Sequence, residues 1–191
     1  MENNIRLGYA CINLTLQNAD KKNKITCNRS MIKRTFLKKG LEYASELAYK
    51  NVKDLITLIE WNNRHEIKVF RMTSCMFPWA SEYNLEDLPD YENIVKCLKI
   101  AGEKAKNYGQ RLSFHPGPFN ILSSPKPNVV ENAYKDLEHH GLVMDLLGMP
   151  RNHWAKINIH VGAAYGNKPM ALDNFRHNFH RLSDSVKSRL T

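Results

Sequence analysis

Residues 111–117 read Arg-Leu-Ser-Phe-His-Pro-Gly, a short apolar strand that runs directly into a histidine and a Pro-Gly turn. Segment 90–108 just before it is expected to be a helix, with Asp90 as its N-cap and Gly109 as its stop. A helix followed at once by a short strand with polar chemistry at its end is typical of α/β folds, in which functional side chains gather where strands end.

The same unit recurs on both sides of this stretch, about every forty residues. Such alternation predicts parallel strands joined by crossover helices, and a doubly wound sheet and a TIM barrel both fit it. No linker interrupts the pattern, so we expect one domain over residues 1–191. The further strands are expected at 5–9, 67–72 and 156–160, and the further helices at 30–62, 128–147 and 169–182.

Composition narrows the class of protein. The formal net charge is +9, which favours a polyanion such as nucleic acid as partner, although a merely basic protein fits equally well. The four cysteines show no C-x-x-C spacing, which argues against a zinc knuckle or a thioredoxin motif. The chain has neither an apolar leader nor a run long enough to span a membrane, so we expect reduced thiols and an intracellular, non-secreted protein of cytoplasm or nucleus.

Three side chains with metal-binding chemistry follow the predicted strands. His115 follows the third strand, His160 ends the fourth, and Glu82 lies in the segment after the second. A lone histidine is usually a hydrogen-bonded structural residue, but two at equivalent positions favour a metal site. Imidazole and carboxylate together suit Mn²⁺, Zn²⁺ or Fe²⁺.

Several motifs, taken together and in order, resemble the UV damage endonucleases. The stretches that carry the resemblance are 7–14, 70–72 with 77–78, 112–117, 135–140 and 162–166. The resemblance covers essentially the whole chain and implies a TIM barrel with a cluster of divalent metals, manganese first and magnesium, zinc or cobalt as alternatives. It also implies a DNA repair enzyme that cuts the backbone of double-stranded DNA on the 5′ side of UV photoproducts.

The resemblance also assigns roles to residues. His115 and His160 match metal-binding histidines of that family. Tyr9 and Asn13 match positions near the surface that binds the lesion. Pro118 and Phe119 match the pair that probes the damaged bases.

This sequence departs from the family pattern in three places. Glu82 stands where the family can carry a metal-binding histidine, and it could still bind a hard divalent metal. Pro118 replaces a residue that is often glutamine, which puts damage selectivity in question. The sequence stops at Thr191, about where the family begins a fifth strand with a metal-bridging glutamate.

A complete (β/α)₈ barrel takes roughly 200 to 250 residues, so we expect the first four βα units, a partial barrel. On this interpretation the isolated chain is inactive unless a second chain completes the barrel. One alternative is a truncated, non-catalytic fragment that binds DNA or a partner. Another is a metal-dependent sugar isomerase or epimerase, against which the +9 charge and the motif after the first strand argue.

Overall fold

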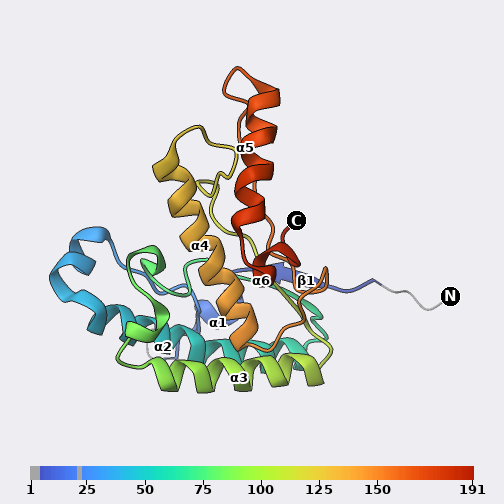
Figure 1. Ribbon diagram of the computed structural model, residues 1–191. Coiled ribbons are helices and arrows are strands. Elements are labelled where there is room, and N and C mark those ends of the chain that lie inside the picture. The colour runs from blue at the N-terminus through green and yellow to red at the C-terminus, as the bar shows by residue number, and fades with distance from the viewer. Residues whose placement is uncertain (1–4, 21–22) are drawn as a thin grey trace.

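The computed structural model describes residues 5–20 and 23–191 (Figure 1). Three strands, β1 (Gly8–Ala10), β2 (Val69–Met72) and β3 (Arg111–Phe114), form a parallel sheet in the order β1-β2-β3. Tyr9 pairs with Phe70, which pairs in turn with Leu112. The predicted α/β class with parallel strands is therefore confirmed.

The strand predicted at 156–160 does not form as a full strand. Ile157 makes single parallel bridges to Phe114 on one side and to Leu190 on the other. The backbone N–H of Ile157 donates to Arg189 O at 2.9 Å, and that of Thr191 donates back to Ile157 O at 2.9 Å. Parallel backbone pairing thus continues past β3 to Ile157 and then to Leu190. At each of these residues only a single bridge forms, so neither segment is a strand.

The four long helices agree with the sequence prediction to within a few residues. They are α2 (Lys33–Arg64), α3 (Tyr91–Asn107), α4 (Pro127–Leu146) and α5 (Lys168–Arg181). Short elements lie between them: α1 (Leu14–Gln17), η1 (Ala80–Glu82), η2 (Leu85–Asp87) and α6 (Asp184–Lys187). No helix among residues 5–20 and 23–191 is long and apolar enough to cross a membrane.

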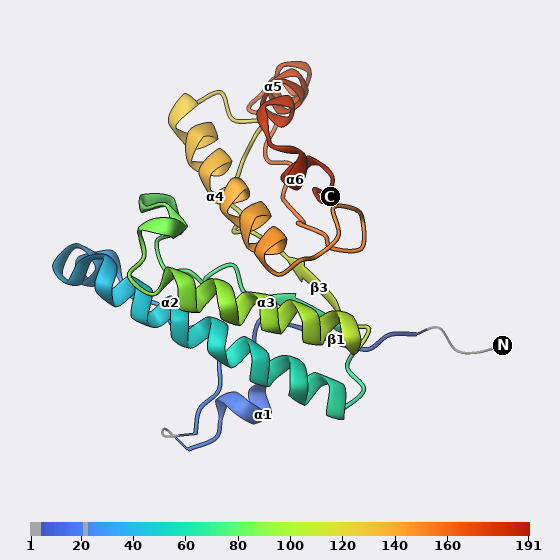
Figure 2. The ribbon, with the colours of Figure 1, turned by 60° about the horizontal axis from the view of Figure 1, so that its bottom comes forward.

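Helix α2 differs from the continuous helix predicted at 30–62, because it breaks at Gly40. This residue has φ 66° and ψ −157°, a backbone conformation that is essentially restricted to glycine. The turns before Gly40 therefore take their own direction and lie at the edge of the molecule, at the left of Figures 1 and 2.

Helices α2 and α3 lie side by side along one face of the sheet (Figure 2). Because side chains alternate along a strand, Phe70 and Met72 of β2 are buried while Arg71 between them is exposed. We call the face that carries Arg71 the open face. The apolar residues of the strands thus form a core with the helices, and a cation projects on the opposite side.

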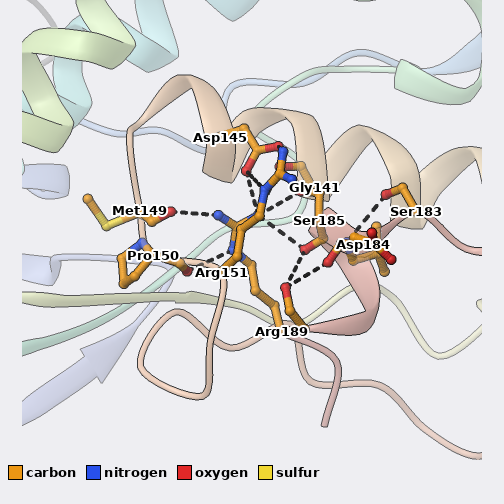
Figure 3. A network of polar contacts seen from close by, with 11 residues as sticks. Gly141, Asp145, Met149, Pro150, Arg151, Ser183, Asp184, Ser185 and Arg189 are labelled. Carbon is orange, nitrogen blue, oxygen red and sulfur yellow. Dashed lines mark hydrogen bonds and ion pairs between the residues drawn. The ribbon is translucent and has the colours of Figure 1, made fainter.

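The buried side chain of Arg189 ties the end of the described chain to α4 and the segment after it (Figure 3). It donates hydrogen bonds to Met149 O at 2.6 Å, Pro150 O at 3.0 Å and Ser185 Oγ at 2.7 Å. It also forms an ion pair with Asp145 at 2.8 Å. The backbone on both sides of Arg189 is therefore fixed.

Asp145 completes this network by also binding the exposed Arg151 at 2.7 Å. Partial burial raises the pKa of Asp145, but the hydrogen bonds from Arg151 and Arg189 outweigh it, so the pKa lies below its ordinary value. Since Arg189 precedes Leu190, the network holds Leu190 against Ile157 and thereby supports the segment that ends at His160.

Candidate functional site

The rings of His115 and His160 lie close together although 44 residues separate the two histidines in the sequence. His115 directly follows β3, and His160 lies three residues beyond the Ile157 bridge. Their ring centroids are 4.9 Å apart, with an angle of 38° between the ring planes. Parallel pairing of the two chain positions thus brings both imidazoles to the same end of the sheet.

Arg71 adds a positive charge to this pair from the open face of β2. Its Nη1 lies 3.5 Å from Nδ1 of His115. Partial burial lowers the pKa of His115, and the neighbouring Arg71 and His160 lower it further. The neutral imidazole, which is the form that binds metal ions, is therefore the main form of His115 at neutral pH.

The two imidazoles fit part of a divalent metal site. Zn²⁺ is usually held by four ligands and Mn²⁺ by up to six. Within residues 5–20 and 23–191, no group of three or more His, Cys, Asp or Glu side chains is placed to hold a metal ion. His115 and His160 can therefore supply two nitrogen donors, and a complete site needs further ligands.

Glu82 does not join the two histidines. It ends η1, and its Oε1 lies 3.4 Å from Nζ of Lys33, with both side chains about half exposed. From the sequence, Glu82 was expected at the same end of the sheet as the two histidines. Its contact with Lys33, 49 positions earlier in the chain, instead decides where the carboxylate lies. Metal ligation by Glu82 stays a prediction that this arrangement does not support.

Tyr9 and Asn13 have structural contacts. The Tyr9 hydroxyl donates to Asn62 Oδ1 of α2 at 2.8 Å, and its ring packs on Phe70 at a centroid distance of 4.9 Å. Asn13 is buried and caps α1, because its Oδ1 accepts from Leu16 N at 3.0 Å. Contact of either side chain with a DNA lesion stays a prediction, and packing accounts for both positions.

Pro118 and Phe119, in contrast, are exposed at the tip of the loop after His115. Phe119 is 85% exposed, which is unusual for an aromatic residue. Asn120 holds the loop, since its Nδ2 donates to Gly117 O at 3.1 Å and to Asp136 Oδ2 on α4 at 2.6 Å. A fixed loop with a free aromatic ring is suited to stacking on a base.

Sequence reasoning missed both Arg71 and Asn120. Arg71 had a signal: it is a cation at an alternating position of the apolar run Val69–Met72, so it must face away from the core. Asn120 had none, because its importance depends on Asp136, sixteen residues further along.

The groove between the η1–η2 segment and α4 is a separate feature. It has a volume of about 770 Å³ and includes neither histidine of the pair. Five acidic residues line it: Glu82, Glu86, Asp87, Glu131 and Glu138. An acidic lining repels phosphate, so this groove is not where a nucleic acid would lie.

The comparisons with known proteins agree with the motifs. A family model described as UV-endonuclease UvdE matches residues 5–191. The UV-damage endonuclease of Schizosaccharomyces pombe is 38% identical over 97% of this chain and 31% of its own length. The putative UV-damage endonuclease of Acanthamoeba polyphaga mimivirus is 35% identical over 97% of this chain and 56% of its own length.

The fold has a solved counterpart as well. The crystal structure of SacUVDE superimposes with a TM-score of 0.84 and 27% sequence identity, covering 98% of this chain and 60% of that chain. The chain therefore spans between about one third and three fifths of the length of these relatives. Since the family model covers nearly the entire sequence, the chain belongs to the UvdE family of UV endonucleases.

Proposed function

We propose that this chain is the part of a metal-dependent UV-damage endonuclease that carries the first metal ligands and the damage-contacting loop. The completed enzyme would nick double-stranded DNA on the 5′ side of UV photoproducts. The observation that carries the proposal is the meeting of His115 and His160, 4.9 Å apart, in a chain that matches the UvdE family over residues 5–191.

The architecture supports a site built from more than this chain. The parallel order of β1, β2, β3, Ile157 and Leu190 would suit the first half of a TIM barrel, a fold whose catalytic residues come from several strand ends. His115 and His160 would each give a ring nitrogen to a divalent ion, manganese being our first choice. The other ligands would come from a longer form of the polypeptide or from a second chain.

The residues around the pair have separate tasks in this proposal. A bound divalent ion would lower the pKa of a water molecule and neutralise charge on the phosphodiester. Arg71 would donate hydrogen bonds to a phosphate oxygen, because its guanidinium lies beside His115 on the open face. Phe119 would stack on a base that the lesion has loosened from the duplex.

Nicking of supercoiled plasmid tests the proposal. The 191-residue chain is incubated with Mn²⁺ and with UV-irradiated or intact plasmid, alone and together with the part of SacUVDE that the chain does not match. We expect nicking of irradiated plasmid only in the combined sample, and its loss when a chelator is added. Lesion-specific nicking by the chain alone would mean that another set of residues carries out the reaction.

A second candidate function is a non-catalytic DNA-binding fragment. The observation that favours it is that no third metal-binding side chain joins the pair within residues 5–20 and 23–191. It predicts tighter binding of irradiated than of intact duplex without nicking in any combination. Binding of neither DNA would contradict both candidates.

A further inference from the structure

The turns of α2 before Gly40 form a short basic segment, residues 33–39, which we call the basic arm. It contains four cations and no acidic residue: Lys33, Arg34, Lys38 and Lys39. All four side chains are exposed, and the glycine conformation at residue 40 separates the arm from the remainder of α2. In Figures 1 and 2 the arm lies at the edge of the molecule, next to the segment that contains η1 and η2.

The arm is held against the segment that follows β2, the strand whose Arg71 lies beside His115. Trp79, in the segment after β2, donates from Nε1 to Met31 O at 3.0 Å. The Phe36 ring of the arm stacks on the Trp79 ring at a centroid distance of 6.2 Å and lies 6.3 Å from the Tyr83 ring. Because these contacts fix the backbone of the arm, less order has to be gained when a partner binds.

Two of the four cations have internal partners. Lys33 pairs with Glu82 and also lies 5.3 Å over the Trp79 ring, while Lys39 lies 3.9 Å over the Tyr43 ring. Arg34 and Lys38 form no ion pair with any described residue. They are four residues apart, so they project from the same side of the helix, where like charges destabilise each other.

Two neighbouring exposed cations are stabilised when anionic groups bind both of them. Adjacent phosphates of a nucleic acid strand provide such a pair of anionic groups. We infer that the basic arm binds the backbone phosphates of duplex DNA flanking the site, through Arg34 and Lys38. This inference rests on the proposed function, which identifies DNA as the partner. Two exposed apolar side chains lie beside the cations, Ile32 just before them and Leu37 among them, and apolar residues exposed singly are normal on a protein surface.

The dependence of DNA affinity on salt tests the inference. The 191-residue chain is titrated with a short fluorescein-labelled duplex at KCl concentrations from about 50 to about 200 mM. The test variant is Arg34→Gln/Lys38→Gln. The matched control is Lys96→Gln/Lys99→Gln on α3, which removes the same charge from two exposed residues that also lack ion pairs within the described chain.

We expect the arm variant to bind about tenfold more weakly near 0.1 M salt, and its plot of log affinity against log salt to be shallower by about two units. The control should keep the slope of the unchanged protein. If both double variants show the same slope, the arm makes no phosphate contact and the inference is wrong, while the proposed function stands. If the unchanged protein does not bind the duplex even at low salt, both the inference and the proposed DNA-binding role are wrong.

Discussion

Phe119 presents an almost free aromatic ring on a loop that Asn120 ties to α4. Stacking of a base on an exposed ring is worth about 1 to 3 kcal/mol. In a completed, active protein, Phe119→Ala should reduce the preference for irradiated over intact duplex by about tenfold. Competition binding measures this preference, and Leu142→Ala, at an apolar residue of α4 that is 40% exposed, is the control. An unchanged preference would mean that the ring does not contact the lesion.

Arg71 has a different expected effect because it lies beside His115 and not at the loop tip. A phosphate contact carries no sequence information, so its loss weakens binding to irradiated and intact DNA alike. Arg71→Gln should therefore lower both affinities by a similar factor and reduce the salt slope by about one unit. Arg176→Gln, on an exposed ion pair of α5, should leave the slope unchanged. A selective loss of binding to irradiated DNA would assign Arg71 to the lesion instead.

His139 gives the molecule a specific sensitivity to acid. Burial, together with the neighbouring His140, lowers the pKa of His139 to about 3, while an unfolded histidine titrates near 6.5. Between pH 6.5 and 3, His139 is therefore protonated in the unfolded state but neutral in the folded state. The free energy of unfolding should fall as pH decreases through this range. Urea denaturation at a series of pH values measures this. In His139→Gln the decrease over this window should be smaller; an equally steep decrease would assign it to other groups.

At the scale of the elements, Gly40 decides the shape of α2. Any other residue must adopt a conformation at φ 66° and ψ −157° that costs about 1 to 3 kcal/mol. Gly40→Ala should therefore lower the free energy of unfolding by about this amount, or straighten α2 and break the contact between Phe36 and Trp79. Chemical denaturation and near-UV circular dichroism detect the two outcomes. Gly117→Ala, where a methyl group meets no atom within 4 Å, should have little effect on either measurement.

The elements themselves were largely predictable. The ends of α3 and α4 agree with the sequence prediction to within one residue, because Asp90, Gly109 and Gly148 mark them locally. The strands were less predictable. The segment 156–160 has the composition of a strand, but only Ile157 finds backbone partners on both sides. Strand pairing depends on where the neighbouring segments lie in space, and this cannot be predicted from the local sequence pattern.

At the scale of the whole molecule, the Arg189 network connects distant parts of the fold. Removing one partner of a buried ion pair typically costs about 3 to 5 kcal/mol, because the other partners lose their hydrogen bonds. Arg189→Met should destabilise the protein by about this amount and release Leu190 from Ile157. Arg176→Met, whose ion pair with Asp173 is exposed, should cost no more than about 1 kcal/mol. Denaturant titration compares the two variants, and equal losses would mean that the network contributes little to stability.

The sequence by itself determined the α/β class, the order of the helices, the position of His115 after its strand, and the family. These features depend on local apolar spacing, on capping residues and on short motifs, all of which can be read along the chain. The tertiary structure alone decided that Arg71 lies beside His115, that Glu82 pairs with Lys33, and that the Tyr9 hydroxyl points to α2. The physical reason is that each of these contacts joins residues more than forty positions apart. Their geometry follows from strand register and helix packing, and a shift of one residue in register would turn every strand side chain to the opposite face.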